Sequence, residues 1–232
     1  MPNWCDNQVT ITGPNSVIDK IEKIVNEPDN IDLSSKEKGE SMGLLNFMYP
    51  MPKELEDTTS PSSSANKPQP MVDGFNNWYD WRCENWSTKW DVSEFYGVDR
   101  QYLTEQSEGE STISFGFSSA WAPPIGVYEQ FLKDNEDCSL KAYYYEGGCD
   151  FMGEWDNGSD DCYAPSDYKS DSDFWNDGIG YNLDEMFNIT ESMAEYEAEL
   201  ERDKLNEDVY KYSKGEKVNL GEDAYWIIEI DF

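Results

Sequence analysis

The chain has 232 residues, of which 49 are acidic, 17 are basic and none is histidine, so its formal net charge is −32. A charge of that size keeps a protein soluble and repels nucleic acid, anionic lipid and acidic proteins. We therefore expect no direct nucleic-acid or membrane partner, and what remains is a basic surface, a cation or no partner at all.

Aromatic residues make up 15% of the chain. An acidic disordered tail contains few of them, so we expect a folded protein. The five cysteines are widely spaced without a CxxC pair, and histidine is absent, which argues against a zinc site and favours reduced thiols in the cytoplasm. Residues 1–6 have neither the basic start nor the apolar stretch of a signal peptide, and no apolar run approaches the roughly 20 residues of a membrane span.

The first third of the chain begins with a strand and a helix. Polar and apolar residues alternate from Gln8 to Thr12 and stop at a Gly-Pro turn, which predicts a strand. Asn15 or Ser16 can cap the helix that follows, and residues 27–30 end it. Residues 44–52 predict a short buried strand or turn closed by prolines, and residues 57–72 predict a flexible loop because they are rich in Ser, Thr and Pro.

The middle of the chain completes an α+β pattern. Aromatic spacing predicts a short helix over 78–86, alternation predicts a strand over 112–117, and Pro123-Pro124 open a second helix. Residues 140–145 and 151–155 predict a hairpin around two glycines. The order predicts a ferredoxin-like antiparallel sheet with helices on one face, spanning residues 1–158.

Residues 159–232 predict an acidic extension. Residues 146–208 hold 20 acids and 3 bases, a net charge of −17. Residues 156–180 are rich in Asp, Ser and Gly and predict an extended loop. Apolar residues at spacings of three and four predict a helix over about 182–208, and residues 225–230 predict a final strand at the edge of the sheet.

Four short motifs resemble the Api92-like or YubB-like proteins of phages and conjugative plasmids. They are the opening MPNWCDN followed by VTITG, the box NWSTKW at 85–90, the box SAWAPP at 119–124, and the glycine-bearing hairpin at 145–153. Ser87 stands where that family usually has glycine, and Ser119 and Ala122 are further departures. The resemblance implies a ferredoxin-like fold and a mobile-element origin for residues 1–158, and it implies no catalytic residue. Its motif residues, for which we expect structural roles, are Asn3, Trp4, Asn7, Asn85, Trp86, Lys89, Trp90, Trp121, Pro123 and Pro124.

A group of tryptophans invites two interpretations, and its members are Trp4, Trp78, Trp81, Trp86, Trp90 and Trp121. Tryptophan faces stack on unpaired bases, but such platforms come with basic grooves, and only Arg82 and Lys89 lie near these residues. We therefore expect the tryptophans to form core under the sheet, with the two cations paired to nearby acids or stacked on an indole face. A pocket for a small ligand around Trp86, Trp90 and Trp121 remains the alternative.

The aspartates of residues 156–177 give a weak signal for a cation. Asp171, Asp173 and Asp177 superficially resemble a calcium loop, but the register fails because Trp175 takes a ligand position. A metal-dependent hydrolase is thus only an alternative, and we expect neither metal nor cofactor. Without histidine and without a P-loop, GxGxxG or GxSxG motif, the sequence predicts no enzyme.

The predicted helix over 182–208 is the basis of a more specific hypothesis about a binding partner. Glu191, Glu195 and Glu199 align at a spacing of four, although like charges at that spacing destabilise a helix by about 0.2–0.5 kcal/mol per pair. Ten acids in 26 residues place roughly one charge per 4 Å of helix axis, against one per about 1.7 Å in duplex DNA. A protein that binds DNA or RNA is the partner that such a helix suits, although a merely solvated acidic helix is the plainer interpretation.

The sequence therefore predicts a non-enzymatic phage or plasmid accessory protein in the host cytoplasm. It would bind and inhibit a basic, nucleic-acid-handling host protein, such as a defence protein, by presenting acids in place of phosphates. The expected partner-binding residues are acids of the helix and the preceding loop: Asp171, Asp173, Asp177, Asp184, Glu185, Glu191, Glu195, Glu197, Glu199, Glu201 and Asp203.

Overall fold

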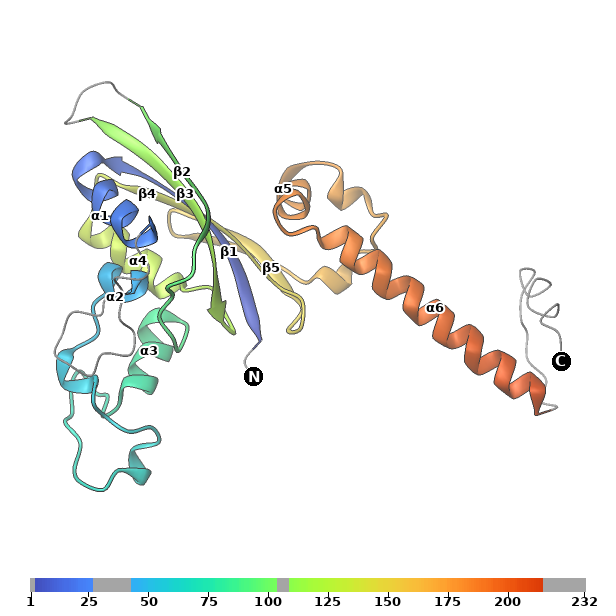
Figure 1. Ribbon diagram of the computed structural model, residues 1–232, viewed down its shortest axis with the longest axis horizontal. Coiled ribbons are helices and arrows are strands. Elements are labelled where there is room, and N and C mark those ends of the chain that lie inside the picture. Colours follow the sequence, from blue (N-terminus) through green and yellow to red (C-terminus); the bar gives the residue numbers. More distant parts are fainter. Residues whose placement is uncertain (1–2, 27–42, 104–108, 215–232) are drawn as a thin grey trace. The chain divides into compact units, whose positions relative to one another are not determined.

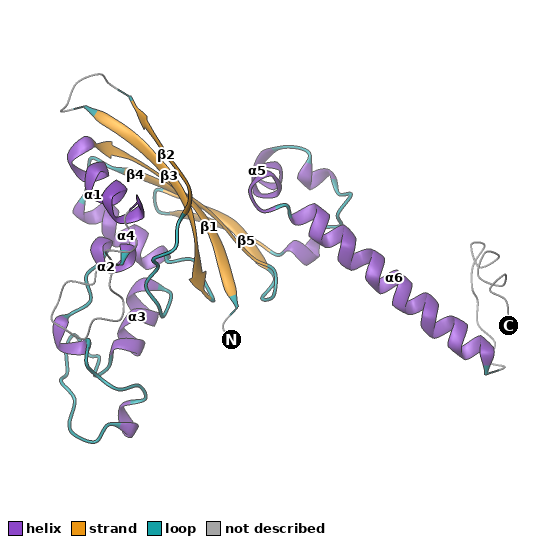
Figure 2. Ribbon diagram, viewed as in Figure 1, coloured by secondary structure: helices purple, strands orange, loops and turns teal. Residues whose placement is uncertain are grey.

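The computed structural model describes residues 3–26, 43–103 and 109–214 (Figure 1). The chain divides into two units, Met1–Tyr168 and Lys169–Phe232. The strands, drawn in orange in Figure 2, are β1 (Trp4–Pro14), β2 (Tyr96–Tyr102), β3 (Glu110–Ala120), β4 (Ser139–Glu146), β5 (Phe151–Asp156) and β6 (Ser159–Tyr163). The α-helices are α1 (Asn15–Asn26), α2 (Leu44–Met48), α3 (Trp78–Trp86), α4 (Ile125–Asp134), α5 (Gly178–Phe187) and α6 (Ile189–Ser213).

The six strands form one antiparallel sheet in the order β2-β3-β1-β4-β5-β6. Its first four strands and the helices α1 and α4 follow each other as β1-α1-β2-β3-α4-β4, which is the split βαβ arrangement of a ferredoxin-like fold. Both helices lie on the same face of the sheet (Figure 1). The predicted α+β class is therefore confirmed, and β5 and β6 extend the sheet beyond β4.

The core lies between the sheet and these helices because the central strands alternate. Val9 and Ile11 of β1 are buried and pair in register with Phe115 and Ile113 of β3, while the residues between them face the other side of the sheet. The stripe on α1 buries Ile18, Ile21 and Val25. Each such side chain stabilises the fold by about 1.5–3 kcal/mol. The strand and helix predicted over residues 8–25 are confirmed.

The prediction of a strand or turn at residues 44–52 is wrong, because residues 44–48 form the helix α2. Its first turn is capped from a distance. The carboxylate of Asp91 accepts the backbone N–H groups of Leu45 at 2.8 Å and Asn46 at 3.1 Å. These are the N–H groups that a helix start leaves without partners. Asp91 lies 46 positions after Leu45 and 45 after Asn46, so local sequence patterns give no sign of the cap.

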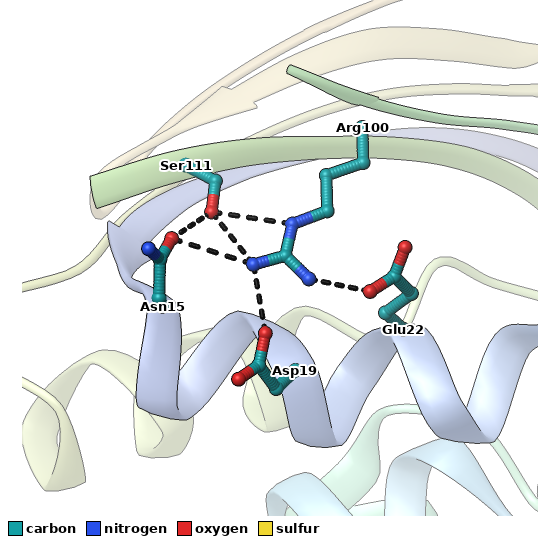
Figure 3. A network of polar contacts seen from close by, with 5 residues as sticks. All are labelled: Asn15, Asp19, Glu22, Arg100 and Ser111. Atoms are coloured by element: carbon teal, nitrogen blue, oxygen red, sulfur yellow. Dashed lines mark hydrogen bonds and ion pairs between the residues drawn. The ribbon is translucent and has the colours of Figure 1, made fainter. Parts of the chain in front are cut away.

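The edge strand β2 was not predicted, because its residues are mostly exposed and do not alternate. The side chain of Arg100, which is 6% exposed, joins β2 to α1 (Figure 3). The guanidinium lies 2.8 Å from Asp19, pairs with Glu22, and donates to Ser111 at 2.9 Å and Asn15 at 3.3 Å. This network ties strands β2 and β3 to the first helix.

The acidic part of the chain differs from its prediction in two places. Residues 159–163 were expected to be loop, but they form β6 and pair with β5. The helix predicted over 182–208 is two helices, α5 and α6. Asn188 separates them in a left-handed conformation, with φ 51°, and asparagine tolerates that region better than most residues. The predicted strand at 225–230 lies outside the described residues.

Candidate interaction surfaces

Three of the four sequence motifs meet at one end of the sheet. Trp4 of the opening motif pairs with Ala120, at the end of β3. The hydroxyl of Thr88, in the second motif, donates to the carbonyl of the same Ala120 at 2.8 Å. The N–H of Trp121 in the third motif donates to the carbonyl of Asn3 at 3.0 Å. Segments more than a hundred residues apart thus form one local structure.

This structure presents a surface that we call the tryptophan patch, defined by Trp4, Lys89, Trp90 and Trp121. Their indoles are well exposed, at 51% for Trp4, 38% for Trp90 and 41% for Trp121. The Lys89 ammonium lies 3.9 Å from the ring centroid of Trp90 and 3.8 Å from that of Trp121, and the rings of Trp4 and Trp90 are 5.9 Å apart. The rings of Trp90 and Trp121 thus each make a cation–π contact with the Lys89 ammonium.

The backbone that positions Trp121 is unusual. Trp121 has φ 72°, in the left-handed region that bulky residues rarely adopt. Strain of this kind costs about 1–3 kcal/mol and persists only where the surroundings enforce it. Here the bond to Asn3 holds one side, and Pro123 and Pro124 lead into α4 on the other. The fold therefore uses a strained residue to hold a large apolar ring at its surface.

The tryptophan core that the sequence predicted exists only in part. Trp81 and Trp86 are buried, and their rings meet edge to face. The indole of Trp86 donates to the carbonyl of Tyr49 at 2.8 Å. Arg82 stacks on the Trp86 ring at 4.5 Å, which confirms the stacking alternative for that cation. Trp4, Trp90 and Trp121 are surface residues instead, whereas Trp86, the third member of the alternative ligand pocket with Trp90 and Trp121, is fully buried.

The remaining motif residues hold the frame beneath the patch. Asn85 accepts a hydrogen bond from the hydroxyl of Tyr49 at 2.9 Å and donates to Trp81 at 2.8 Å. Asn7 is fully buried, and its amide donates to the hydroxyl of Ser119 at 2.9 Å. Ser119 in turn donates to Ala122 at 2.8 Å. Ser119 therefore acts as a hydroxyl bridge between the first and third motifs.

The second surface is the acidic helix α6. It carries eight acidic and three basic residues over 25 positions. An apolar stripe on a helix is buried either on its own domain or on a partner, and here most of the stripe is open. Ile189 is buried, whereas Tyr196 is 62% and Leu200 is 50% exposed. These two side chains are four positions apart, so they lie on one face of the helix.

Some of the predicted partner-binding acids have contacts inside the second unit. Asp184 accepts the N–H of Thr190 at 2.7 Å and so caps the start of α6. Glu197 accepts the N–H of Ser170 at 3.2 Å and its hydroxyl at 2.7 Å, and these two bonds lower the pKa of Glu197. Further contacts join Glu191 to Asn188, Asp173 to Asn176, and Glu199 to Arg202.

The other predicted acids are exposed, and none of their side chains forms a hydrogen bond or ion pair with another residue that the structure describes. They are Asp171, Asp177, Glu185, Glu195, Glu201 and Asp203. Glu195, Glu201 and Asp203 belong to α6, Glu185 belongs to α5, and Asp171 and Asp177 come from the segment before α5. The acids therefore surround the helix and do not form the single ridge that the aligned glutamates suggested.

Two kinds of feature were sought within residues 3–26, 43–103 and 109–214: a group of metal ligands and a membrane-spanning helix. No three cysteine, aspartate or glutamate side chains there come together as a group that could hold a metal ion. The aspartates of the loop thus form no such group of three among the described residues. None of the helices in these ranges is long and apolar enough to cross a membrane.

Comparisons with known proteins add little. No family model matches the chain, and no curated protein matches it. A solved structure that is similar is a crystal structure of the protein api92 from Yersinia pseudotuberculosis. The TM-score is 0.36 at 12% identity, over 71% of this chain and 95% of that chain. A likeness of this size carries no argument, so the ferredoxin-like fold stands on the strand order.

The exposure of the tryptophan patch is what the sequence interpretation missed. Aromatic residues usually indicate core, and composition alone does not separate a buried indole from an exposed one. A local signal was present, because Trp121 is followed by Ala-Pro-Pro and Trp90 ends a polar turn after α3. Residues next to turns lie at the surface more often than residues within helices.

Proposed function

We propose that the protein is a non-enzymatic accessory protein of a phage or plasmid, which binds and inhibits a basic, nucleic-acid-handling host protein. The mobile-element origin rests on the motif resemblance. The binding role rests on one observation above all. Helix α6 exposes Tyr196 and Leu200 on one face, with unpaired acids on both sides of that face.

The charge of α6 suits a groove that otherwise holds nucleic acid. Eight acids over 25 residues correspond to about one negative charge per 5 Å of helix axis. Duplex DNA has one per about 1.7 Å, so the helix offers roughly a third of that density. It therefore competes for some phosphate sites, and the remaining affinity must come from other contacts.

The exposed apolar face supplies those contacts. An amphipathic helix binds a partner by placing apolar side chains at spacings of three and four into a groove. Tyr196 and Leu200 meet that requirement, Glu195 and Glu201 flank them, and Asp203 follows on the same face. The acids steer the encounter and select a basic rim, while burial of the two apolar side chains slows dissociation. The expected partner thus has a basic groove with an apolar floor.

A pull-down of the full chain from host lysate at about 0.15 M salt tests this proposal, followed by competition with duplex DNA. We expect a basic protein to be captured and then displaced by DNA. Glu191, Glu195 and Glu199 are replaced by glutamine in the test variant. The matched control replaces Glu54, Glu56 and Asp57, three exposed acids of the first unit, by their amides. Both variants lose the same charge.

Capture must weaken in the α6 variant and persist in the control. A second variant, Leu200→Asn, keeps the charge and must also weaken capture. Equal capture by all variants would show that only the net charge of −32 matters. The inhibitor proposal would be contradicted if no basic protein were captured, or if duplex DNA did not displace the captured protein.

A further inference from the structure

Helix α6 presents an aromatic ring and an acid on the same exposed face. Tyr196 is exposed, and Leu200 and Asp203 follow it at spacings of four and three, so the three side chains lie along one face of the helix. The Asp203 carboxylate is exposed and forms no hydrogen bond or ion pair with another residue that the structure describes. A ring, an aliphatic side chain and a carboxylate therefore succeed each other over about 10 Å of helix axis.

The spacing of charge along α6 distinguishes two kinds of nucleic acid. Its eight acids and three bases over 25 residues leave a net charge of −5, which is about one charge per 7–8 Å of axis. Duplex DNA has one charge per about 1.7 Å, and each of its strands has one per about 3.4 Å. A strand whose bases are unstacked is longer still for each phosphate. In charge density the helix is therefore closer to a single strand than to a duplex.

The width of α6 favours the same partner. An α-helix with its side chains is about 10–12 Å across. The major groove of B-DNA alone is about 12 Å wide, so a protein surface shaped around a whole duplex is wider than one helix. A groove that follows a single strand is narrower than that surface, and one helix fills it better.

The exposed ring of Tyr196 gives the clearest distinction. In a duplex the base faces are stacked on each other, so proteins that bind it contact phosphates and the edges of the bases. Proteins that bind single strands instead place aromatic side chains against unstacked bases, beside a basic groove that follows the backbone. Tyr196 offers such an aromatic side chain a ring on which to stack, while Asp203 lies on the same face for the basic groove.

We propose that the partner of α6 is a protein that binds single-stranded nucleic acid, and that α6 occupies its strand-binding groove. Tyr196 stacks on an aromatic side chain that otherwise holds a base, and Leu200 packs beside it. Asp203 lies at a cationic site that otherwise holds a phosphate. This inference rests on the function proposed for α6, and it narrows the partner from nucleic-acid-handling proteins in general to this class.

Elution from the immobilised full chain tests the class of partner. Host proteins captured at about 0.15 M salt are eluted with oligothymidylate or with duplex DNA at equal nucleotide concentrations. We expect oligothymidylate to elute the captured protein at a concentration at least tenfold lower than duplex DNA, which elutes it at higher concentration through the same basic sites. The purified partner must then bind fluorescent oligothymidylate, and the full chain must displace that probe.

Substitutions at position 196 separate a stacked ring from a merely apolar side chain. Tyr196→Phe keeps the ring, so it must displace the probe within about twofold of the wild type. Tyr196→Leu keeps apolar area without a ring and must displace the probe about tenfold less well, because stacking is lost. Tyr181→Leu makes the same change at an exposed ring of α5, serves as the matched control, and must leave displacement unchanged.

The outcomes separate this inference from the function on which it rests. Elution by duplex DNA at an equal or lower concentration than oligothymidylate overturns the single-strand partner and leaves the proposed inhibitor standing. Equal displacement by Tyr196→Phe and Tyr196→Leu does the same, because a duplex groove with an apolar floor accepts either side chain. Capture of no basic protein, or of one that duplex DNA does not displace at any concentration, contradicts the proposed function and this inference with it.

Discussion

The carboxylate of Asp91 caps Leu45, whose backbone N–H lies 2.8 Å from it, and thereby starts a helix on the other side of a long loop. The same carboxylate accepts the N–H groups of Asn46 and Val92. The close approach needs a glycine at position 43, because a Cβ added to Gly43 would lie 2.3 Å from the Asp91 side chain. One side chain therefore joins the segment before the loop to the segment after α3.

We expect Asp91→Ala to lower the free energy of unfolding by about 1–3 kcal/mol, because three backbone N–H groups lose their acceptor. Asp57→Ala removes an equal charge at an exposed position and serves as the control. In a chain this acidic, that control change is neutral or slightly stabilising. Urea denaturation of both variants measures the difference, and equal stabilities would show that Asp91 is not a cap.

The Arg100 network gives a second prediction, about the edge of the sheet (Figure 3). Arg100→Met leaves Glu22 without its cation and removes the donors to Ser111 and Asn15. We expect a loss of about 1–3 kcal/mol, less than for a fully buried pair because Asp19 and Glu22 are partly exposed. Hydrogen exchange must speed up in β2 before it does so in β1. Arg202→Met, at an exposed position on α6, is the matched control and must leave exchange in β2 unchanged.

Ser87 gives a third prediction, which links a sequence departure to backbone geometry. Ser87 ends α3 with φ 65°, the left-handed conformation in which glycine is favoured. The related motif usually has glycine at this position. We expect Ser87→Gly to raise the free energy of unfolding by about 0.5–1 kcal/mol, because glycine adopts the left-handed conformation without strain. This gain is reduced by the loss of one weak hydrogen bond, in which the Ser87 hydroxyl accepts the N–H of Gly126 at 3.3 Å.

Ser87→Ala separates these two effects. It keeps the left-handed strain and removes the hydroxyl, so we expect it to be less stable than the wild type. Thermal denaturation of the three proteins gives the order glycine, serine, alanine. An order in which alanine exceeds serine would mean that the hydroxyl contributes nothing, and a glycine variant below the wild type would contradict the strain argument.

Much of the ferredoxin-like domain follows from sequence because its elements are periodic. The alternation in β1 and β3 and the stripe on α1 are local patterns, and each predicts both the element and its buried face. Two of the elements that were missed have long-range causes. Helix α2 depends on Asp91, and strand β2 depends on the Arg100 network. Neither of these distant contacts produces a periodic pattern in the sequence of α2 or β2.

The candidate sites were predictable to a smaller extent. The acids of α6 are visible in the sequence, but their partners are not. Nothing local indicates that Glu197 binds Ser170 or that Asp184 caps a helix which begins after Asn188. The break at Asn188 was hidden because apolar residues continue through it at helical spacing. The tryptophan patch was misjudged because burial depends on the packing of three distant segments.

The contact between Glu197 and Ser170 gives a prediction about pH. Hydrogen bonds from the Ser170 hydroxyl and N–H lower the pKa of Glu197 in the folded chain. A lowered pKa means that the contact is stabilising above the ordinary glutamate pKa and is lost as the pH falls through the lowered value. Acidification must therefore release the segment around Ser170 from α6.

Titration of the Glu197 side-chain carboxyl by carbon-13 NMR measures this effect. We expect Ser170→Ala to raise the pKa of Glu197 towards its ordinary value, because the hydroxyl is the larger of the two causes of the shift. Ser192→Ala is the matched control, since it deletes an exposed hydroxyl of α6 that bonds to the carbonyl of Asn188 and not to Glu197. An unchanged Glu197 pKa in Ser170→Ala would show that the hydroxyl does not hold the carboxylate. A rise in both variants would place the cause in the helix itself.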